Sequence, residues 1–133
     1  MAQNDLAGLS PARIGVLMVD FQNQFCHPRA CGTGPVTNRH NARTARRANA
    51  FAAEAACLGA QVIYTRQVLD PGELTARQRQ CDEQLGLCRK GTWEAELFIA
   101  PVLGSVVVTK PRFDVWQSRE FLDYLTADPM MDS

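Results

Sequence analysis

The chain alternates between short apolar runs and longer amphipathic segments. Residues 14–19 form a nearly continuous apolar run, the pattern of a parallel strand covered on both faces. Two further runs, 61–66 and 105–110, carry the β-branched and apolar residues typical of strands. Between the first two runs, alanines recur at helical spacing over 41–58. Gly59 follows at the position where a residue in the left-handed conformation is expected to cap the end of this helix.

The remaining segments are more polar. Residues 21–40 are rich in Gly, Pro and Asn and predict a loop. Residues 67–92 are mostly polar and contain a DPGE turn, and the pattern of 74–86 fits a short helix. A helical turn is expected within 93–100, and the spacing of apolar residues predicts a helix over 115–125.

Strand, helix, strand, long excursion, strand and helix follow one another along the chain. This alternation predicts an α/β fold, with a parallel sheet between helices on both faces. The length of 133 residues suits one domain. We expect that domain over 13–133, preceded by a lead-in over 1–12 that has no export-signal pattern.

Composition narrows the class of protein. The formal net charge is zero, so no overall field recruits nucleic acid or an anionic membrane. No apolar run approaches the roughly 20 residues that span a bilayer. Five cysteines, an odd number without an export signal, indicate reduced thiols and a cytoplasmic protein. Their spacing does not match that of zinc sites.

Three ionisable residues follow the predicted strands: Asp20, Arg66 and Lys110. Ligands of parallel sheets bind beyond the carboxyl ends of the strands, so these side chains are expected at one rim. Asp20 and Lys110 allow two interpretations. They are either a structural ion pair or an acid/base with a cationic stabiliser, and the spacing leaves both open.

Four segments, in order, resemble the isochorismatase-like cysteine hydrolases. They are VLMVDFQNQF, GAQVIYTR, GTWEAEL and VVVTKPRFDVWQSREFLDYL, which lie within roughly residues 13 to 125. The resemblance implies a three-layer, Rossmann-like sheet of strand order 3-2-1-4-5-6. It also implies a hydrolase with a small-molecule substrate, in which it cleaves an amide or ureide C–N bond or a vinyl ether.

The same resemblance implies roles for individual residues. In the family's Cys-Asp-Lys triad, Asp20 would be the acid/base and Lys110 its cationic partner. The implied substrate-binding residues are Gln22, Phe25, Arg66 and Trp116. No metal or other cofactor is expected, because the segment after the second strand offers Asp70 but no His.

The sequence also departs from the family pattern. The nucleophilic Cys belongs to a G-x-x-T-D/N-x-C-V segment after a fourth strand, and the chain ends at Ser133 before that position. None of the five cysteines matches that position. Cys26 is interpreted as a loop residue in preference to a substitute nucleophile. The family's Ser-Ala-Phe is Asp114-Val115-Trp116 here, and its Thr is Arg119. These charges would alter substrate choice or cap and solvate a helix.

A sheet that stops after its third strand has the order 3-2-1 and leaves the first strand at an edge. An apolar edge strand is prone to pairing, so we expect a homo-oligomer or edge-strand pairing. Whether this chain alone catalyses is left open. The alternative function is a catalytically inactive remnant that binds a small molecule or another subunit.

Overall fold

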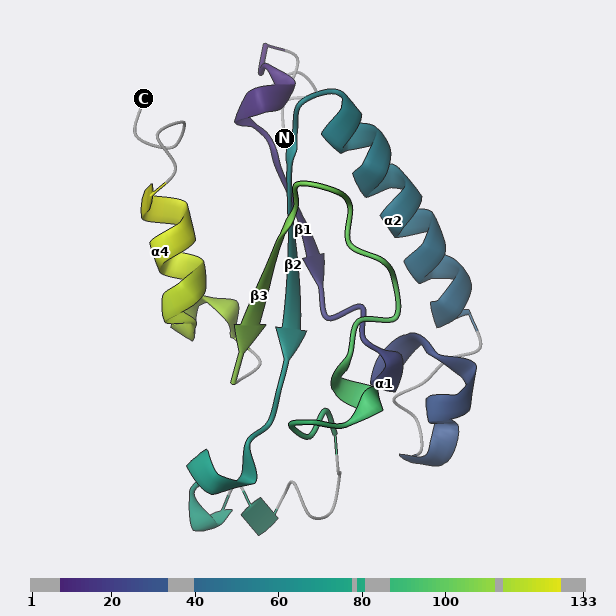
Figure 1. Ribbon diagram of the computed structural model, residues 1–133, viewed down its shortest axis with the longest axis vertical. Helices are drawn as coiled ribbons and strands as arrows, with labels where there is room; N and C mark the ends of the chain where they lie inside the picture. Colours follow the sequence, from purple (N-terminus) through teal and green to yellow (C-terminus); the bar gives the residue numbers. More distant parts are fainter. Residues whose placement is uncertain (1–7, 34–39, 78, 81–86, 112–113, 128–133) are drawn as a thin grey trace, which may run out of the picture.

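Three parallel strands form the sheet at the centre of the molecule. The computed structural model describes residues 8–33, 40–77, 79–80, 87–111 and 114–127. The strands are β1 (Gly15–Val19), β2 (Gln61–Gln67) and β3 (Val106–Lys110), in the order β1-β2-β3 (Figure 1). Both pairings are parallel, with Val19 opposite Thr65 and Gln67 opposite Lys110. The three predicted strands and the 3-2-1 order are confirmed.

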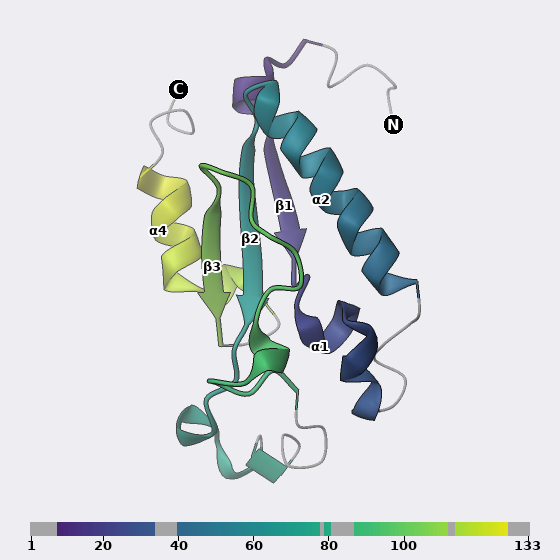
Figure 2. The ribbon, with the colours of Figure 1, turned by 45° about the vertical axis from the view of Figure 1, so that its right-hand side comes forward.

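Helices lie on both sides of this sheet. The long helix α2 (Asn41–Cys57) runs along one side, and α4 (Arg119–Ala127) lies on the other (Figures 1 and 2). A short helix, α1 (Asn23–Cys26), follows the end of β1. The described segments also contain short 3₁₀ helices, namely η1 (Pro11–Arg13), η2 (Pro28–Thr33), η3 (Pro71–Glu73), η4 (Trp93–Ala95) and η5 (Val115–Gln117). The predicted three-layer α/β arrangement is confirmed.

Each face of the sheet has its own apolar cluster, because successive strand residues point to opposite faces. On the α2 face, Met18 and Tyr64 pack with the small residues Ala45 and Ala52, both fully buried. Small side chains at these positions let the helix approach the sheet closely. On the α4 face, Phe121 packs with Ile63 and Val108.

The first strand is an edge strand, as the 3-2-1 order requires. Its sequence predicts cover on both faces, and this prediction is wrong for one of them. Leu17 is 40% exposed and Val19 is 50% exposed, and both lie on the α4 face of the sheet. The cause is that Phe121 of α4 packs against β2 and β3, so this face of β1 has no helix of the described chain against it.

Two segments differ from the sequence-based predictions. The segment 21–40 is not simply a loop, because α1 and η2 lie within it. A residue distant in sequence holds the start of α1, since the Asn23 N–H donates to the Glu96 carbonyl at 2.8 Å. The predicted helix over 115–125 is divided into η5 and α4, and the buried Ser118 at the break accepts a hydrogen bond from the Phe121 N–H.

The remaining expectations hold in part. The helix predicted over 41–58 ends at Cys57, and Gly59 adopts φ +102°, as expected of a cap. The expected turn in DPGE is η3, and the helical turn within 93–100 is η4. The helix predicted over 74–86 falls largely outside the described residues. Of the helices described, none has the length and apolarity that a membrane crossing needs.

Candidate functional site

Asp20 and Lys110 meet where their strands end. The Lys110 Nζ lies 3.0 Å from Asp20 Oδ2. The Lys110 side chain is only 1% exposed, whereas that of Asp20 is 19% exposed. The pair therefore combines a buried ammonium with a carboxylate that solvent still reaches.

Thr65 holds the other side of Asp20. Its Oγ1 donates to Asp20 Oδ1 at 2.9 Å, and its carbonyl accepts the Asp20 N–H at 3.1 Å. Asp20 has φ +57°, a left-handed conformation that Asp adopts more readily than most residues. The role of Thr65 was not predicted from the sequence. The available signal was a hydroxyl residue in the otherwise apolar run VIYT, which pairs with the strand that ends at Asp20.

The other residues implied by the family resemblance are spread around this rim. Arg66 is half-buried, and its Nε donates to Thr109 Oγ1 at 2.9 Å. Phe25 is partly buried against the α2-face core. Trp116 is 61% exposed, with its ring edge-on to Phe121 at 5.2 Å between centroids. No contact that the structure describes assigns Phe25, Arg66 or Trp116 a substrate role, so these roles stay predictions.

Gln22 has a clear structural role. Its side chain is fully buried, and its Nε2 donates to the carbonyls of Gln67 and Ala95, each at 2.7 Å. Its Oε1 accepts the Gln67 N–H at 2.8 Å. The neighbouring Asn23 Nδ2 donates to the Trp93 carbonyl at 2.9 Å. Gln22 thereby ties the end of β2 to the segment ahead of β3, just below Asp20.

The described cysteines are not prepared as nucleophiles. Burial raises the pKa of the Cys26 thiol to about 11. Burial, with the negative charges of Asp20 and Glu94, raises the pKa of Cys88 to about 12. Since the thiolate is the reactive form, both thiols are protonated and inert near neutrality. Cys57 is exposed, but it ends α2 and lies toward the amino ends of the strands (Figure 1).

Metal ligands do not gather in the described part of the chain. No three or more His, Cys, Asp or Glu side chains come together there. Asp70, the acid that follows β2, accepts the Gly72 N–H at 2.9 Å and pairs with Lys90 at 3.2 Å. The Gly72 hydrogen bond, with Lys90, lowers the pKa of Asp70. Asp70 therefore caps the turn η3.

Two of the departures from the family pattern have structural explanations. Asp114 accepts the Trp116 N–H at 3.0 Å and caps η5. Arg119 pairs with Asp123 one helical turn later, and both side chains are mostly exposed. Of the two interpretations of these charges, capping and solvation are what the structure describes.

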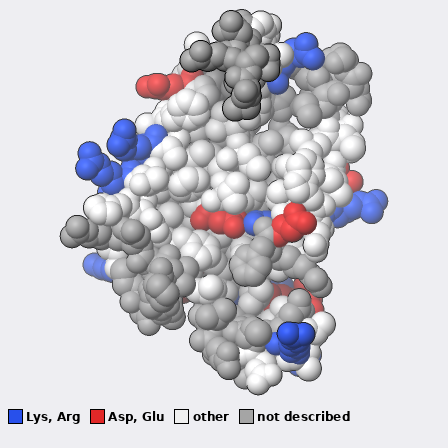
Figure 3. Space-filling model, turned by 180° about the vertical axis from the view of Figure 1, so that it is seen from behind, with Lys and Arg blue, Asp and Glu red and all other residues white. Residues whose placement is uncertain are grey.

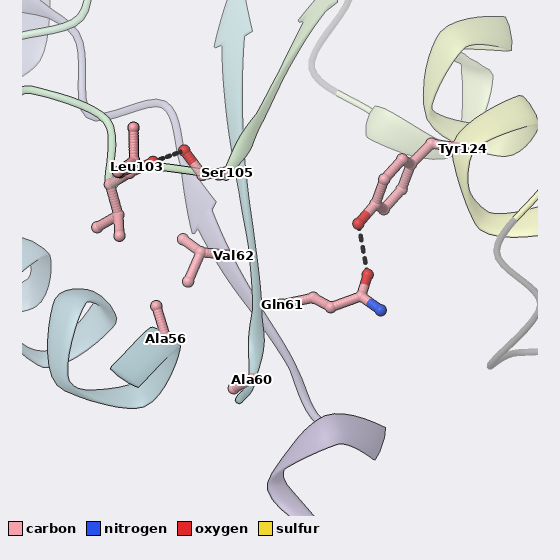
Figure 4. A pocket seen from close by; sticks show the side chains of 9 residues that line it. Ala56, Ala60, Gln61, Val62, Leu103, Ser105 and Tyr124 are labelled. Atoms are coloured by element: carbon pink, nitrogen blue, oxygen red, sulfur yellow. Dashed lines mark hydrogen bonds between the residues drawn. The ribbon is translucent and has the colours of Figure 1, made fainter. Parts of the chain in front are cut away.

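A hollow of about 220 Å³ lies at the opposite end of the sheet from Asp20. The Tyr124 hydroxyl of α4 donates to Gln61 Oε1 at the start of β2, and the two side chains point toward each other (Figure 4). Ser105 and Leu103 line the hollow from the segment before β3. It is therefore separate from the carboxyl-end rim.

Charged side chains of both signs are scattered over the face seen from behind (Figure 3). Lys and Arg lie mostly toward its margins, and a small mixed group of acidic and basic atoms lies near its middle. The described Lys and Arg side chains on this face therefore form no broad basic surface for a polyanion.

The fold and the rim together define a class: a parallel α/β protein with a lysine-paired aspartate where its strands end. The family model described as the Isochorismatase domain matches residues 15–130. The chain therefore belongs to the isochorismatase family. A comparison with curated proteins gives no match.

Three solved structures are similar to this chain. A cysteine hydrolase from Pseudomonas syringae pv. phaseolicola has a TM-score of 0.71 at 24% identity over 90% of this chain and 56% of its own. An isochorismatase family protein from Desulfovibrio vulgaris has a TM-score of 0.67 at 23% identity over 86% and 60%. A pyrazinamidase of Pyrococcus horikoshii, in complex with zinc, has a TM-score of 0.62 at 17% identity over 86% and 64%. At these identities the likeness is one of fold, and this chain spans less than two thirds of each structure.

Proposed function

We propose that the chain carries the proton-handling half of a metal-free hydrolase site for a small amide or ureide. The observation that carries this proposal is the Asp20–Lys110 pair, a partly exposed carboxylate 3.0 Å from a buried ammonium at the carboxyl ends of the strands. Membership of the isochorismatase family supports the hydrolase class. The odd number of cysteines supports a cytoplasmic site of action.

In the proposed reaction, Asp20 accepts the proton of a cysteine thiol, and the thiolate forms a bond to the substrate carbonyl carbon. When the C–N bond breaks, the proton passes from Asp20 to the departing nitrogen. Water then hydrolyses the thioester, which releases the acid and restores the thiol. Lys110 offsets the negative charge that develops on the reacting groups during these steps. The thiol corresponds to none of the cysteines whose side chains the structure describes, so this chain's assigned share is Asp20 and Lys110.

The proposal is tested by ammonia release from a panel of small amides and ureides, with EDTA present. We expect Asp20→Asn and Lys110→Ala each to lower the rate at least about 100-fold, the usual contribution of a positioned acid/base. Asp70→Asn is the matched control, because Asp70 also pairs with a lysine but lies on the surface. Hydrolysis that persists at the wild-type rate in both site variants contradicts the proposal.

The second candidate is a subunit-interaction module. The observation that favours it is the open edge of β1, where Leu17 and Val19 are 40% and 50% exposed on an apolar strand. Edge strands of this kind present unpaired backbone groups to a further strand. We propose a second copy of this chain as the occupant, because β1 has no charged residue to oppose self-pairing.

Sedimentation velocity over a range of concentrations tests the interaction module. We expect the wild-type chain to self-associate, and Leu17→Lys to shift it to monomer, because a lysine on an edge strand blocks pairing. Leu58→Lys is the matched control, since Leu58 is 72% exposed after α2 and lies away from the edge. A wild-type chain that stays monomeric at every concentration contradicts this candidate.

A further inference from the structure

The carboxylate of Asp20 is held through both of its oxygens. Lys110 Nζ lies 3.0 Å from Oδ2, and Thr65 Oγ1 donates to Oδ1 at 2.9 Å. Thr65 is fully buried, and Lys110 is 1% exposed. The two groups that hold the carboxylate thus come from two different strands, β2 and β3.

Thr65 contacts Asp20 at its backbone as well. The Asp20 N–H lies 3.1 Å from the Thr65 carbonyl and 3.3 Å from its Oγ1. A hydroxyl has one hydrogen, which here goes to Asp20 Oδ1, and its lone pairs remain to accept from the Asp20 N–H. One side chain therefore fixes both the backbone and the carboxylate of a residue whose φ is +57°.

We propose that Thr65 is a positioning residue for Asp20. Its hydroxyl fixes the rotation of the carboxylate, while Lys110 holds the second oxygen. This inference rests on the proposed role of Asp20 as the acid/base. An ionised carboxylate has about four lone-pair sites, so two anchored oxygens still leave sites that accept a proton. Without the hydroxyl, the carboxylate is held at one oxygen and turns about that contact, which misaligns proton transfer.

Kinetics of Thr65→Val and Thr65→Ser are the first test. Valine keeps the shape of threonine without its hydroxyl, and serine keeps the hydroxyl. We expect Thr65→Val to lower kcat about 10- to 100-fold with KM changed by less than about threefold, as for a misplaced catalytic group. Thr65→Ser should retain at least about a third of the wild-type kcat. A Thr65→Val variant with wild-type kcat overturns the inference.

A double-mutant cycle in urea unfolding is the second test, and it requires no hydrolysis. We expect Thr65→Val to lower the unfolding midpoint in the wild-type chain and to lower it much less in an Asp20→Ala background. A residue that only fills space shifts both backgrounds equally, and that result overturns the inference. Hydrolysis that Asp20→Asn leaves unchanged, together with intact coupling, refutes the proposed function, while the contact between Thr65 and Asp20 remains demonstrated.

Discussion

At the scale of single residues, Lys110 is the side chain on which the candidate site depends for its charge. It is 1% exposed, and Asp20 lies 3.0 Å away. A buried ammonium without its carboxylate is strongly unfavourable, because the cost of desolvation is no longer offset. The stability of the fold and the chemistry of the rim are therefore linked through one contact.

We predict that Asp20→Asn lowers the free energy of unfolding by about 3 kcal/mol, the usual effect of removing one partner of a buried pair. Urea denaturation followed by circular dichroism measures it. The double variant Asp20→Asn/Lys110→Met should regain most of the loss, since methionine fills similar space without a charge. A double variant no more stable than Asp20→Asn would show that the loss has another cause.

The two charged residues of the site could be predicted from sequence, but the groups that hold them could not. Asp20 and Lys110 each end an apolar run, and the ends of parallel strands meet at one rim. Thr65 lies inside such a run, where threonine is an ordinary strand residue. The family resemblance implies a substrate role for Gln22, which stays a prediction, and no local pattern indicates that its buried amide bonds backbone groups of distant segments. Partners distant in sequence are set by the fold, which no local pattern encodes.

At the scale of elements, Tyr64 links the long helix to the sheet. It is fully buried in β2, and its hydroxyl donates to Asn49 Oδ1 of α2 at 2.5 Å. The Tyr64 hydroxyl oxygen also accepts a hydrogen bond from the Val102 N–H, at 3.1 Å, in the segment ahead of β3. One hydroxyl therefore joins three parts of the chain.

We predict that Tyr64→Phe lowers the free energy of unfolding by about 1 to 2 kcal/mol, because the partly buried Asn49 amide oxygen and Val102 N–H lose their partner. Thermal and urea unfolding measure the change. Tyr124→Phe is the matched control, with a smaller expected loss, because Tyr124 is only half-buried where it bonds Gln61. Equal losses in the two variants would contradict the assigned role of Tyr64.

Elements with strong periodicity were predicted well, and elements that depend on tertiary contacts were not. The alanine spacing of α2 and the β-branched run of β3 identify these elements without further information. The short α1 has four residues, too few for a periodic signal, and it forms where Asn23 reaches the Glu96 carbonyl. The exposure of β1 depends on where α4 packs, which its own sequence does not contain.

At the scale of the whole molecule, two buried thiols make the free energy of unfolding depend on pH in the alkaline range. Burial raises the pKa of Cys26 to about 11 and that of Cys88 to about 12, above the ordinary thiol value. The folded chain therefore binds these protons more tightly than the unfolded chain. Their contribution is complete below a pH of about 8.5 and is lost as the pH rises toward the folded values.

We predict that the urea unfolding midpoint falls from pH 8 to pH 10 through these two thiols. The double variant Cys26→Ala/Cys88→Ala should show a smaller fall over the same interval, and this difference isolates the thiols from tyrosine and lysine titration. Cys57→Ala serves as the control, because this thiol is exposed. Identical pH dependence in wild type and double variant would contradict the prediction.

The contacts of Gln22 bear on how the protein tolerates insertions and deletions. One amide bonds Gln67 and Ala95, so the excursion between them is closed at its base, within the reach of a single side chain. Closing a longer or shorter flexible loop between fixed ends changes the free energy only slowly with length. We therefore expect that insertions or deletions within the excursion in engineered chimeras leave the acid at the end of β1 in place.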